Sequence, residues 1–267
     1  MTDNKHVSRD VLHVTGSNRT FESRSIVREV PLTITVNGRE LITLLTTGDA
    51  NRELAVGFLL SEGFISKKED LKSIRLDDDS GIVEAVLTAD CSLAEELWGK
   101  RAVTSGCGKG ATFYHLMDSL QAKQVSSGIS VTPVQVYGLM KELNRLSELY
   151  RETGGVHNSA LADGNSILIF REDIGRHNAV DKIRGASFLE DIPLQNKILV
   201  TTGRISSEIV VKVAKMGVPI LISRSAPTSL ALDLAERTGL TVIGYARGRR
   251  MTVYSGKERF RVPSAPV

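Results

Sequence analysis

The second half of the chain alternates short apolar runs with helical patterns, and this alternation constrains the fold more than any other feature. Four runs rich in Ile, Val and Leu are expected to be buried strands, at residues 166–170, 197–201, 218–223 and 241–245. Patterns of helical period separate them, at residues 177–186, 206–216 and 228–238. Buried strands that alternate with helices form a mostly parallel sheet with helices on both faces. The sequence therefore predicts an α/β fold built on a mixed or parallel sheet.

The N-terminal part of the chain has a different pattern, which predicts a β-rich elaboration of that sheet. Residues 26–46 alternate between apolar and polar side chains around an Asn-Gly pair, the strongest short-range signal of a β-hairpin. A second hairpin is expected at residues 71–88, around an acidic turn. Between the two hairpins, residues 51–62 have helical spacing and end before Gly63, a residue that suits the end of a helix.

A further helix is expected just before the first buried strand. Thr132 followed by Pro133 is typical of a helix start. The helix is expected to run to about Glu152, where a pair of glycines follows, and to carry Tyr150 on its apolar face.

The domain organisation predicted is a short arm followed by one domain. Residues 1–22 are polar, and their apolar residues follow neither the helical nor the strand period, so a loose N-terminal arm is expected there. Residues 23–267 contain no internal repeat and no low-complexity linker, and they are expected to form a single α/β domain.

Composition limits the classes of partner and the compartment. Lys and Arg number 34 and Asp and Glu 31, so the net charge of 34 − 31 = +3 does not by itself indicate a nucleic acid partner. No apolar run approaches the roughly 18 residues of a membrane span, and the first ten residues lack the apolar core of a signal peptide. Two cysteines cannot form a disulfide framework. A cytoplasmic protein that binds neither membrane nor nucleic acid is expected.

One cysteine stands in a glycine loop, TSGCGKG at residues 104–110. The glycines leave the sulfur of Cys107 uncovered, and Lys109 favours the thiolate, the reactive form. The other interpretation is a flexible turn with an incidental cysteine. The loop has no C-x-x-C pair, because Thr104 and Gly110 occupy the positions three residues away. The chain also lacks H-E-x-x-H, so no structural metal is expected.

Polar residues gather at two other junctions. His157 follows a double glycine in GGVHNSAL, and Asp173 and His177 lie in REDIGRHN, directly after a predicted strand. Ligands of open α/β sheets bind at such strand ends. A Cys-His hydrolase is one hypothesis, with His157 or His177 as the base and Asp173 as the group that orients it. Structural histidines and a solvated polar turn are the alternatives.

Two turns between a strand and a helix could bind anions. The first, TTGRISSE, holds Gly203, Arg204 and Ser206 at the start of a predicted helix, where free N–H groups favour an anion. The second, SRSAPTSLA, places Arg224 before a helix capped by Thr228 or Ser229.

The last stretch, residues 245–261, carries six basic residues and one acidic residue. Arginine side chains suit phosphate groups. RNA is a competing ligand, because Tyr245 and Tyr254 could stack on bases. A basic surface tail that only aids solubility is the third interpretation.

Taken together, these stretches resemble the formate dehydrogenase accessory sulfurtransferase (FdhD) family. The resemblance covers most of the chain after about residue 25 and rests on seven segments in order: GFLLSEGFI (57–65), TSGCGKG (104–110), GGVHNSAL (154–161), EDIGRHNAVDKIRG (172–185), TGRISSEIVVKVAKMGVPIL (202–221), SAPTSLALDLAE (225–236) and GYARGRRMTVYSG (244–256).

The resemblance implies a fold and a task. Proteins of this family have a cytidine-deaminase-like fold and work as homodimers. They take sulfur from a cysteine desulfurase as a persulfide on a loop cysteine and pass it to the molybdenum cofactor, bis-molybdopterin guanine dinucleotide, for formate dehydrogenase. Deamination itself is not expected, because the H-x-E and P-C-x-x-C motifs of zinc deaminases are absent.

The resemblance also assigns residues. Many members carry C-G-x-C-G in the loop, and here Cys107 takes the second cysteine position and Thr104 the first. Cys107 is therefore expected to carry the persulfide, whose outer sulfur the acceptor attacks directly. The residues expected to hold the cofactor are Gly203, Arg204, Ser206, Tyr245, Ala246, Arg247, Gly248, Arg249 and Arg250. A molybdenum-cofactor chaperone that transfers no sulfur is the alternative.

Overall fold

The computed structural model describes residues 5–88, 125 and 127–262. The prediction for Cys107 and its loop lies outside the described residues.

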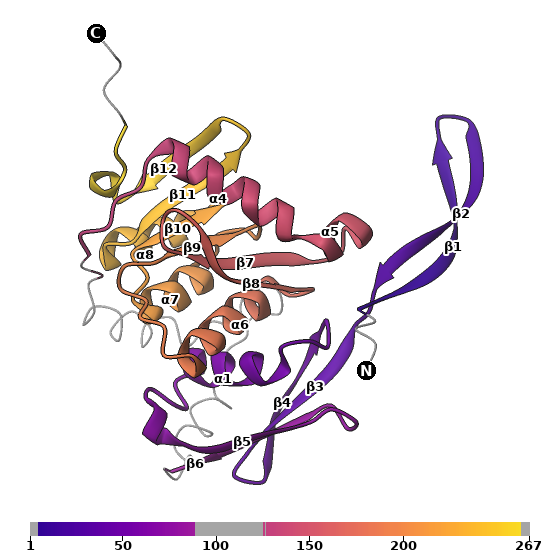
Figure 1. Ribbon diagram of the computed structural model, residues 1–267, viewed down its shortest axis with the longest axis horizontal. Helices are drawn as coiled ribbons and strands as arrows, with labels where there is room; N and C mark the ends of the chain where they lie inside the picture. The colour runs from indigo at the N-terminus through magenta and orange to yellow at the C-terminus, as the bar shows by residue number, and fades with distance from the viewer. Residues whose placement is uncertain (1–4, 89–124, 126, 263–267) are drawn as a thin grey trace.

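A six-stranded mixed sheet forms the centre of the molecule (Figure 1). Its strand order is β12-β11-β10-β9-β7-β8. The strands are β7 (His157–Ala162), β8 (Ile167–Asp173), β9 (Ile198–Thr201), β10 (Ile220–Ser223), β11 (Thr241–Arg247) and β12 (Arg250–Ser255). Strands β8 to β11 run in one direction, whereas β7 and β12 run in the other. The carboxyl ends of four strands therefore meet at one edge of the sheet, where β7 begins.

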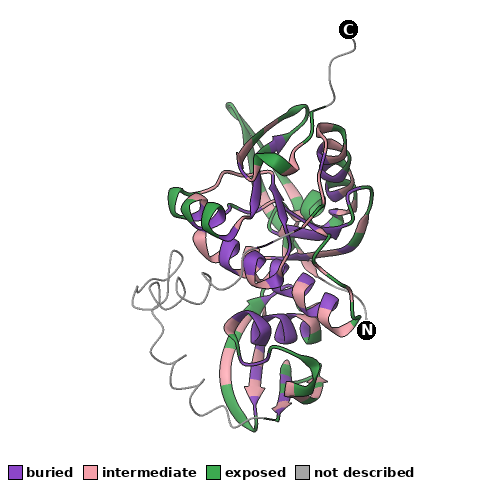
Figure 2. Cartoon of the chain, turned by 90° about the vertical axis from the view of Figure 1, so that its left-hand side faces the viewer, coloured by how far each residue is buried: buried purple, intermediate pink, exposed green. Residues whose placement is uncertain are grey.

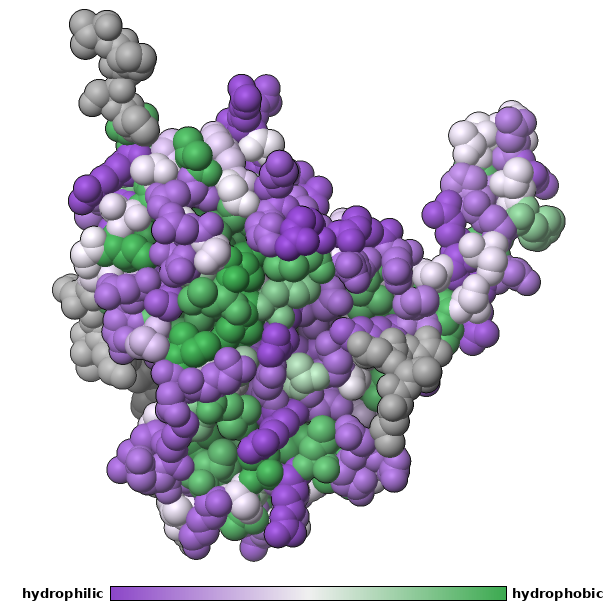
Figure 3. All heavy atoms as spheres, viewed as in Figure 1, coloured by the Kyte–Doolittle hydropathy of each residue, from purple (hydrophilic) through white to green (hydrophobic). Residues whose placement is uncertain are grey.

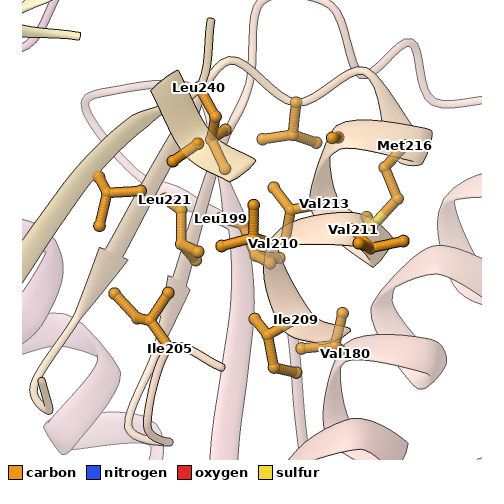
Figure 4. Packing of buried hydrophobic residues seen from close by; sticks show 14 of the residues in the cluster. Val180, Leu199, Ile205, Ile209, Val210, Val211, Val213, Met216, Leu221 and Leu240 are labelled. Atoms are coloured by element: carbon orange, nitrogen blue, oxygen red, sulfur yellow. The ribbon is translucent and has the colours of Figure 1, made fainter. Parts of the chain in front are cut away.

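Helices cover both faces of this sheet, as the alternating pattern predicts. One face packs against α6 (Arg176–Leu189), α7 (Ser207–Met216) and α8 (Ser229–Thr238). Side chains of α7 such as Val210 and Val213 lie against Leu199 and Leu221 of the sheet (Figure 4). The other face packs against α4 (Pro133–Leu146), followed by α5 (Glu148–Thr153). The strands between these layers are buried (Figure 2). The mixed α/β fold is confirmed, and the cytidine-deaminase likeness stays a prediction.

A second sheet of four strands forms the N-terminal lobe, in the order β4-β3-β6-β5. Its strands are β3 (Val30–Val36), β4 (Arg39–Thr46), β5 (Leu71–Asp77) and β6 (Ile82–Leu87), with α1 (Asn51–Glu62) packed against them. Short 3-10 turns lie at Lys68–Asp70 and Lys257–Arg259. Both predicted hairpins are present. At the β3–β4 turn, Asn37 and Gly38 have φ of 50° and 80°, the conformation that an Asn-Gly hairpin requires.

The two lobes meet where α1 crosses α6. A Cβ atom on Gly57 would lie 1.8 Å from the carbonyl oxygen of Asp181, and one on Gly185 would lie 1.8 Å from that of Glu53. Neither position can hold a side chain unless the helices move apart. The two glycines therefore allow the helix backbones to touch and the lobes to pack as one body.

The N-terminal arm has regular structure that the sequence pattern did not predict. Strands β1 (His6–Thr15) and β2 (Asn18–Val27) form an antiparallel hairpin that projects from the body, largely with polar side chains (Figure 3). Most of its side chains are exposed on both faces, and Phe21 is 85% exposed, so no buried face imposes the usual alternation. The sequence pattern did not predict these two strands, and the expectation of a loose arm over residues 1–22 stays a prediction. The division into an arm and one domain stays a prediction.

The expected helix over residues 133–152 is broken at Ser147. The start is as predicted, since Thr132 caps α4. The Ser147 Oγ donates a hydrogen bond to the Leu143 carbonyl at 2.6 Å and accepts one from the Asn158 Nδ2 at 2.5 Å. Ser147 itself has φ −78° and ψ 65°, outside the helical range, so α4 ends and α5 begins at this residue. Tyr150 is therefore not on a buried face, as the pattern predicted, but is 39% exposed.

None of the helices in the described part of the chain is long and apolar enough to cross a membrane.

Candidate functional site

A cleft lies at the edge of the six-stranded sheet where β8 to β11 end and β7 begins. Its volume is about 430 Å³. Its lining comes from five strand ends, from α5 and from the segment between α5 and β7: Tyr150, Gly154, Gly155, Val156, His157, Ile174, Thr202, Arg224, Ser225 and Arg247. Strand ends of open α/β sheets are the usual place for ligands.

Two arginines give the cleft a cationic end. Arg224 follows β10 and Arg247 ends β11, on the neighbouring strand. The Arg247 Nε donates to the carbonyl oxygen of Arg224 at 2.9 Å, which orients the Arg247 guanidinium. No ion pair between described residues includes either arginine. Their charge is therefore free to attract an anion, and arginine forks suit phosphate.

Hydroxyl groups fix the turn beside the arginines. The Ser225 Oγ donates to the Thr202 carbonyl at 3.1 Å, and the Ser225 backbone N–H donates to the Ser223 Oγ at 2.9 Å. These bonds connect the ends of β9 and β10, so this part of the cleft wall is held by both strands.

His157 stands between the cationic end and α5. Its side chain is half-buried, and its Nδ1 lies 3.5 Å from the Thr202 Oγ1. Burial lowers the pKa of His157, and the charges of Arg176, Arg204 and His177 lower it further. The imidazole is therefore neutral at pH 7 and can accept a hydrogen bond.

The start of α7 lies next to the cleft. Ser206 is its N-cap residue but forms no side-chain capping bond. Its buried Oγ and the buried Nε of Arg176 have no hydrogen-bond partner among the described residues. A Cβ on Gly203 would lie 2.9 Å from the Cβ of Arg176, so glycine allows Arg176 to approach this turn. Unpaired buried donors near a helix N-terminus fit an oxygen-rich anion such as phosphate.

The structure places the predicted cofactor residues in different surroundings. Arg247 lines the cleft, while Gly248, Arg249 and Arg250 form the exposed turn into β12. Tyr245 is 49% exposed, and the side chain of Ala246 is buried in the apolar cluster under α4. Gly203 and Ser206 are buried at the start of α7, and Arg204 is exposed there. Their roles toward a cofactor stay predictions.

Asp173 is not placed to orient a catalytic histidine. It is fully buried and accepts hydrogen bonds from the Gly175 N–H and the Asn178 Nδ2, both at 2.9 Å, and pairs with Lys182 at 2.7 Å. Asp173 is the strand partner of His157 in the β7–β8 ladder, but no side-chain hydrogen bond between described residues joins its carboxylate to His157 or His177. The Nε2 of His177 lies instead 3.1 Å from Glu208.

A second pocket, of about 360 Å³, lies where the lobes meet and includes Asp49, Glu53, Arg171 and Glu172. Its charges are largely paired with one another. Arg171 forms a bidentate ion pair with Glu53: its Nε lies 2.5 Å from the Oε2 atom and its Nη2 lies 2.7 Å from the Oε1 atom. Burial alone would raise the pKa of Asp49, but Lys182, Lys5 and Thr47 together lower it below its usual range. We therefore regard the cleft with the free arginines as the better candidate for a ligand site.

Sequence reasoning missed part of the cleft. Thr202, Arg224 and Ser225 belong to turns that the sequence marks as anion sites, and Ile174 lies in the polar stretch REDIGRHN. Tyr150 carries no such signal, because its position depends on the helix break at Ser147.

Comparison with known proteins now decides the family. A model of the FdhD/NarQ family matches residues 27–261. The chain belongs to this family. The resemblance read from the sequence motifs is thereby confirmed.

Relatives within the FdhD/NarQ family match nearly the whole chain. The protein named sulfur carrier protein FdhD from Staphylococcus haemolyticus is 46% identical over 237 residues, which are 89% of this chain and 90% of that protein. Its namesake from Halalkalibacterium halodurans is 40% identical over 269 residues, with both chains fully covered. A solved structure, of a formate dehydrogenase accessory protein from Desulfotalea psychrophila, is 25% identical. It matches with a TM-score of 0.79 over 96% of this chain and 99% of that chain.

Proposed function

We propose that this protein is a sulfur carrier for formate dehydrogenase. It accepts sulfur from a cysteine desulfurase as a persulfide on Cys107 and transfers it to the molybdenum cofactor, bis-molybdopterin guanine dinucleotide. The names of its relatives support the carrier role, since a protein 46% identical and another 40% identical are called sulfur carrier protein FdhD. A cytoplasmic location and a homodimer belong to the same proposal.

The observation that carries the cofactor part of this proposal is the cationic end of the cleft. Arg224 and Arg247 present charge that no described carboxylate neutralises, at a strand edge where α/β proteins bind nucleotides. The unpaired donors of Arg176 and Ser206 lie near the same edge. A guanine dinucleotide carries phosphates that would satisfy both sets of donors.

The loading of sulfur onto Cys107 needs only exchange between sulfur atoms. The Cys107 thiolate attacks the outer sulfur of the desulfurase persulfide, a new S–S bond forms on Cys107, and the desulfurase cysteine leaves as a thiolate. No oxidant enters this step. The predicted role of Lys109 is to hold the Cys107 thiolate and, later, the persulfide anion.

The proposal is tested by intact-mass analysis after incubation with a cysteine desulfurase and cysteine. The protein should gain the mass of about one sulfur atom and lose it on reduction. Cys107→Ser should abolish the gain, and Cys91→Ser, the matched control at the other cysteine, should retain it. A gain that persists in the Cys107→Ser protein would contradict the assignment.

A cofactor chaperone without sulfur transfer is the second candidate, because described residues alone form the cationic end of the cleft. It predicts that Cys107→Ala leaves formate dehydrogenase maturation unchanged. The sulfur carrier predicts that maturation is lost although the variant still binds the nucleotide part of the cofactor.

A further inference from the structure

The two ends of the cleft differ in chemistry. The cationic end consists of Arg224, Ser225 and Arg247, at the ends of β10 and β11. The opposite end, here called the tyrosine end, consists of Tyr150, Gly154, Gly155 and Val156, just before β7. The tyrosine end carries no charged side chain.

Sheet order sets how far apart the two ends are. Strands β11 and β7 are separated by β10 and β9. Neighbouring strands lie about 4.8 Å apart, so three spacings amount to about 14 Å. The cleft therefore has room for a ligand whose anionic and ring-shaped parts lie at separate ends.

Tyr150 is held in place at its end of the cleft. The Arg151 Nη1 donates to the carbonyls of Asn144 and Arg145, at 2.9 and 2.8 Å, which ties α5 to the end of α4. The Gly154 N–H donates to the Tyr150 carbonyl at 2.8 Å and closes the helix. Together with the Ser147 bonds, these contacts fix the backbone that carries the tyrosine ring.

The glycines beside Tyr150 keep this end open. A Cβ on Gly154 would meet no atom within 4 Å, so the space next to it is free. A Cβ on Gly155 would lie 2.6 Å from the Cγ1 of Val27 in β2, so close packing against the hairpin excludes a side chain there. Because the two glycines add no side chains next to Tyr150, the face of another aromatic ring can stack on the tyrosine ring.

We infer that the cleft binds its ligand in one orientation, with a planar heterocycle stacked on Tyr150 and phosphates at Arg224 and Arg247. This inference rests on the proposed function, because a guanine dinucleotide supplies both parts. It makes Tyr150 and Arg224 binding residues, and it assigns Tyr150 the part of the affinity that distinguishes a nucleotide from a simple phosphate.

Titration calorimetry on the full chain with two probes tests this orientation. Guanosine diphosphate contains the ring and the phosphates, whereas inorganic pyrophosphate contains only the phosphates. Tyr150→Ala should weaken the binding of guanosine diphosphate by about 5- to 150-fold, the range of a lost base–aromatic stack. Its affinity for pyrophosphate should stay within about twofold of the wild type. Tyr150→Phe, which keeps the ring, should bind both probes as the wild type does. Arg224→Gln should weaken the binding of both probes.

Three other results would contradict either this orientation or the proposed function. Unchanged guanosine diphosphate affinity in Tyr150→Ala would overturn the inference. An equal loss for both probes in that variant would also overturn it, because Tyr150 would then act through the shape of the cleft. Wild-type protein that binds neither probe would contradict the cofactor part of the proposed function itself.

Discussion

Cationic side chains occur both at the junction of the two lobes and in the cleft. Those at the junction are paired with carboxylates, whereas those in the cleft pair with no described carboxylate. At the junction, Lys182 is fully buried, and its Nζ lies 2.7 Å from Asp173, 2.8 Å from Asp49 and 2.9 Å from the Thr47 Oγ1. In the cleft, no described carboxylate pairs with Arg224 or Arg247. A buried charge must be paired for the chain to fold, whereas an unpaired charge at an open edge attracts a ligand.

This contrast predicts which measurement each region affects. Substitutions at the junction should change the free energy of unfolding. Substitutions in the cleft should change the affinity for phosphates and leave folding nearly unchanged.

Replacement of Lys182 by Met should have the largest effect. It leaves the buried Asp173 carboxylate without its cation and leaves Asp49 with Lys5 alone. Breaking a buried pair in this way costs about 3–5 kcal/mol. Lys141→Met, on the exposed face of α4, should stay within about 0.5 kcal/mol. Denaturant unfolding of both variants measures the difference. Equal stability of the two would show that the junction does not depend on its buried cation.

Arg247→Gln should reduce the affinity for guanosine diphosphate by about 10- to 100-fold, the range expected when a hydrogen bond to a charged group worth about 1.5–3 kcal/mol is lost. Its free energy of unfolding should stay within about 0.5 kcal/mol of the wild type. The control is Arg237→Gln, at the exposed end of α8. If both variants bind alike, the cationic end is not the phosphate site.

Gly185→Ala tests the close contact of α1 and α6. The added Cβ would clash with the Glu53 carbonyl, and overpacking of this kind costs about 1–3 kcal/mol. Gly138 in α4 is the matched control, because a Cβ there would meet no atom within 4 Å. Gly138→Ala should instead stabilise the protein by about 0.5–1 kcal/mol. Thermal unfolding distinguishes the two signs, and a stabilising Gly185→Ala would contradict the packing described.

The smallest effect expected is a pH dependence of stability through His157. Its pKa is lowered in the folded protein, by burial and by Arg176, Arg204 and His177. As the pH falls through 6.5, the unfolded chain binds a proton at this position before the folded chain does, so the protein loses stability. His157→Gln should reduce the loss between pH 7.5 and pH 5.5, as measured by melting temperature. An unchanged loss would assign the pH dependence to other groups.

Local elements were predictable because their signals lie within a few neighbouring residues. The Asn-Gly pair before Arg39 predicts the β3–β4 hairpin, and Gly63 predicts the end of α1; both are present. The strands β8 to β11 and the helices between them appear where the alternation of apolar runs and helical patterns places them. The projecting hairpin was missed because exposed strands lack the apolar period on which such predictions rest.

The candidate site was predictable only in pieces. Arg247, Gly203 and Ser206 are found from the residue types of their turns. Residues of the same motif separate in space, however, since Arg247 lines the cleft while Ala246 is buried in the core. Alternate residues of a strand point to opposite faces, so a strand segment cannot direct all of its side chains into one site.

The sequence by itself determined the α/β class, most helix and strand positions, the family and the candidate cysteine. Only the tertiary structure brought Tyr150, Arg224 and Arg247 into one cleft and enclosed Lys182 between the lobes. Periodicity and turn residues act over a few positions along the chain, so they are readable from it. The order of strands in the sheet and the break at Ser147 depend on contacts between distant residues, such as the bond from Asn158 to Ser147. No local pattern encodes such contacts.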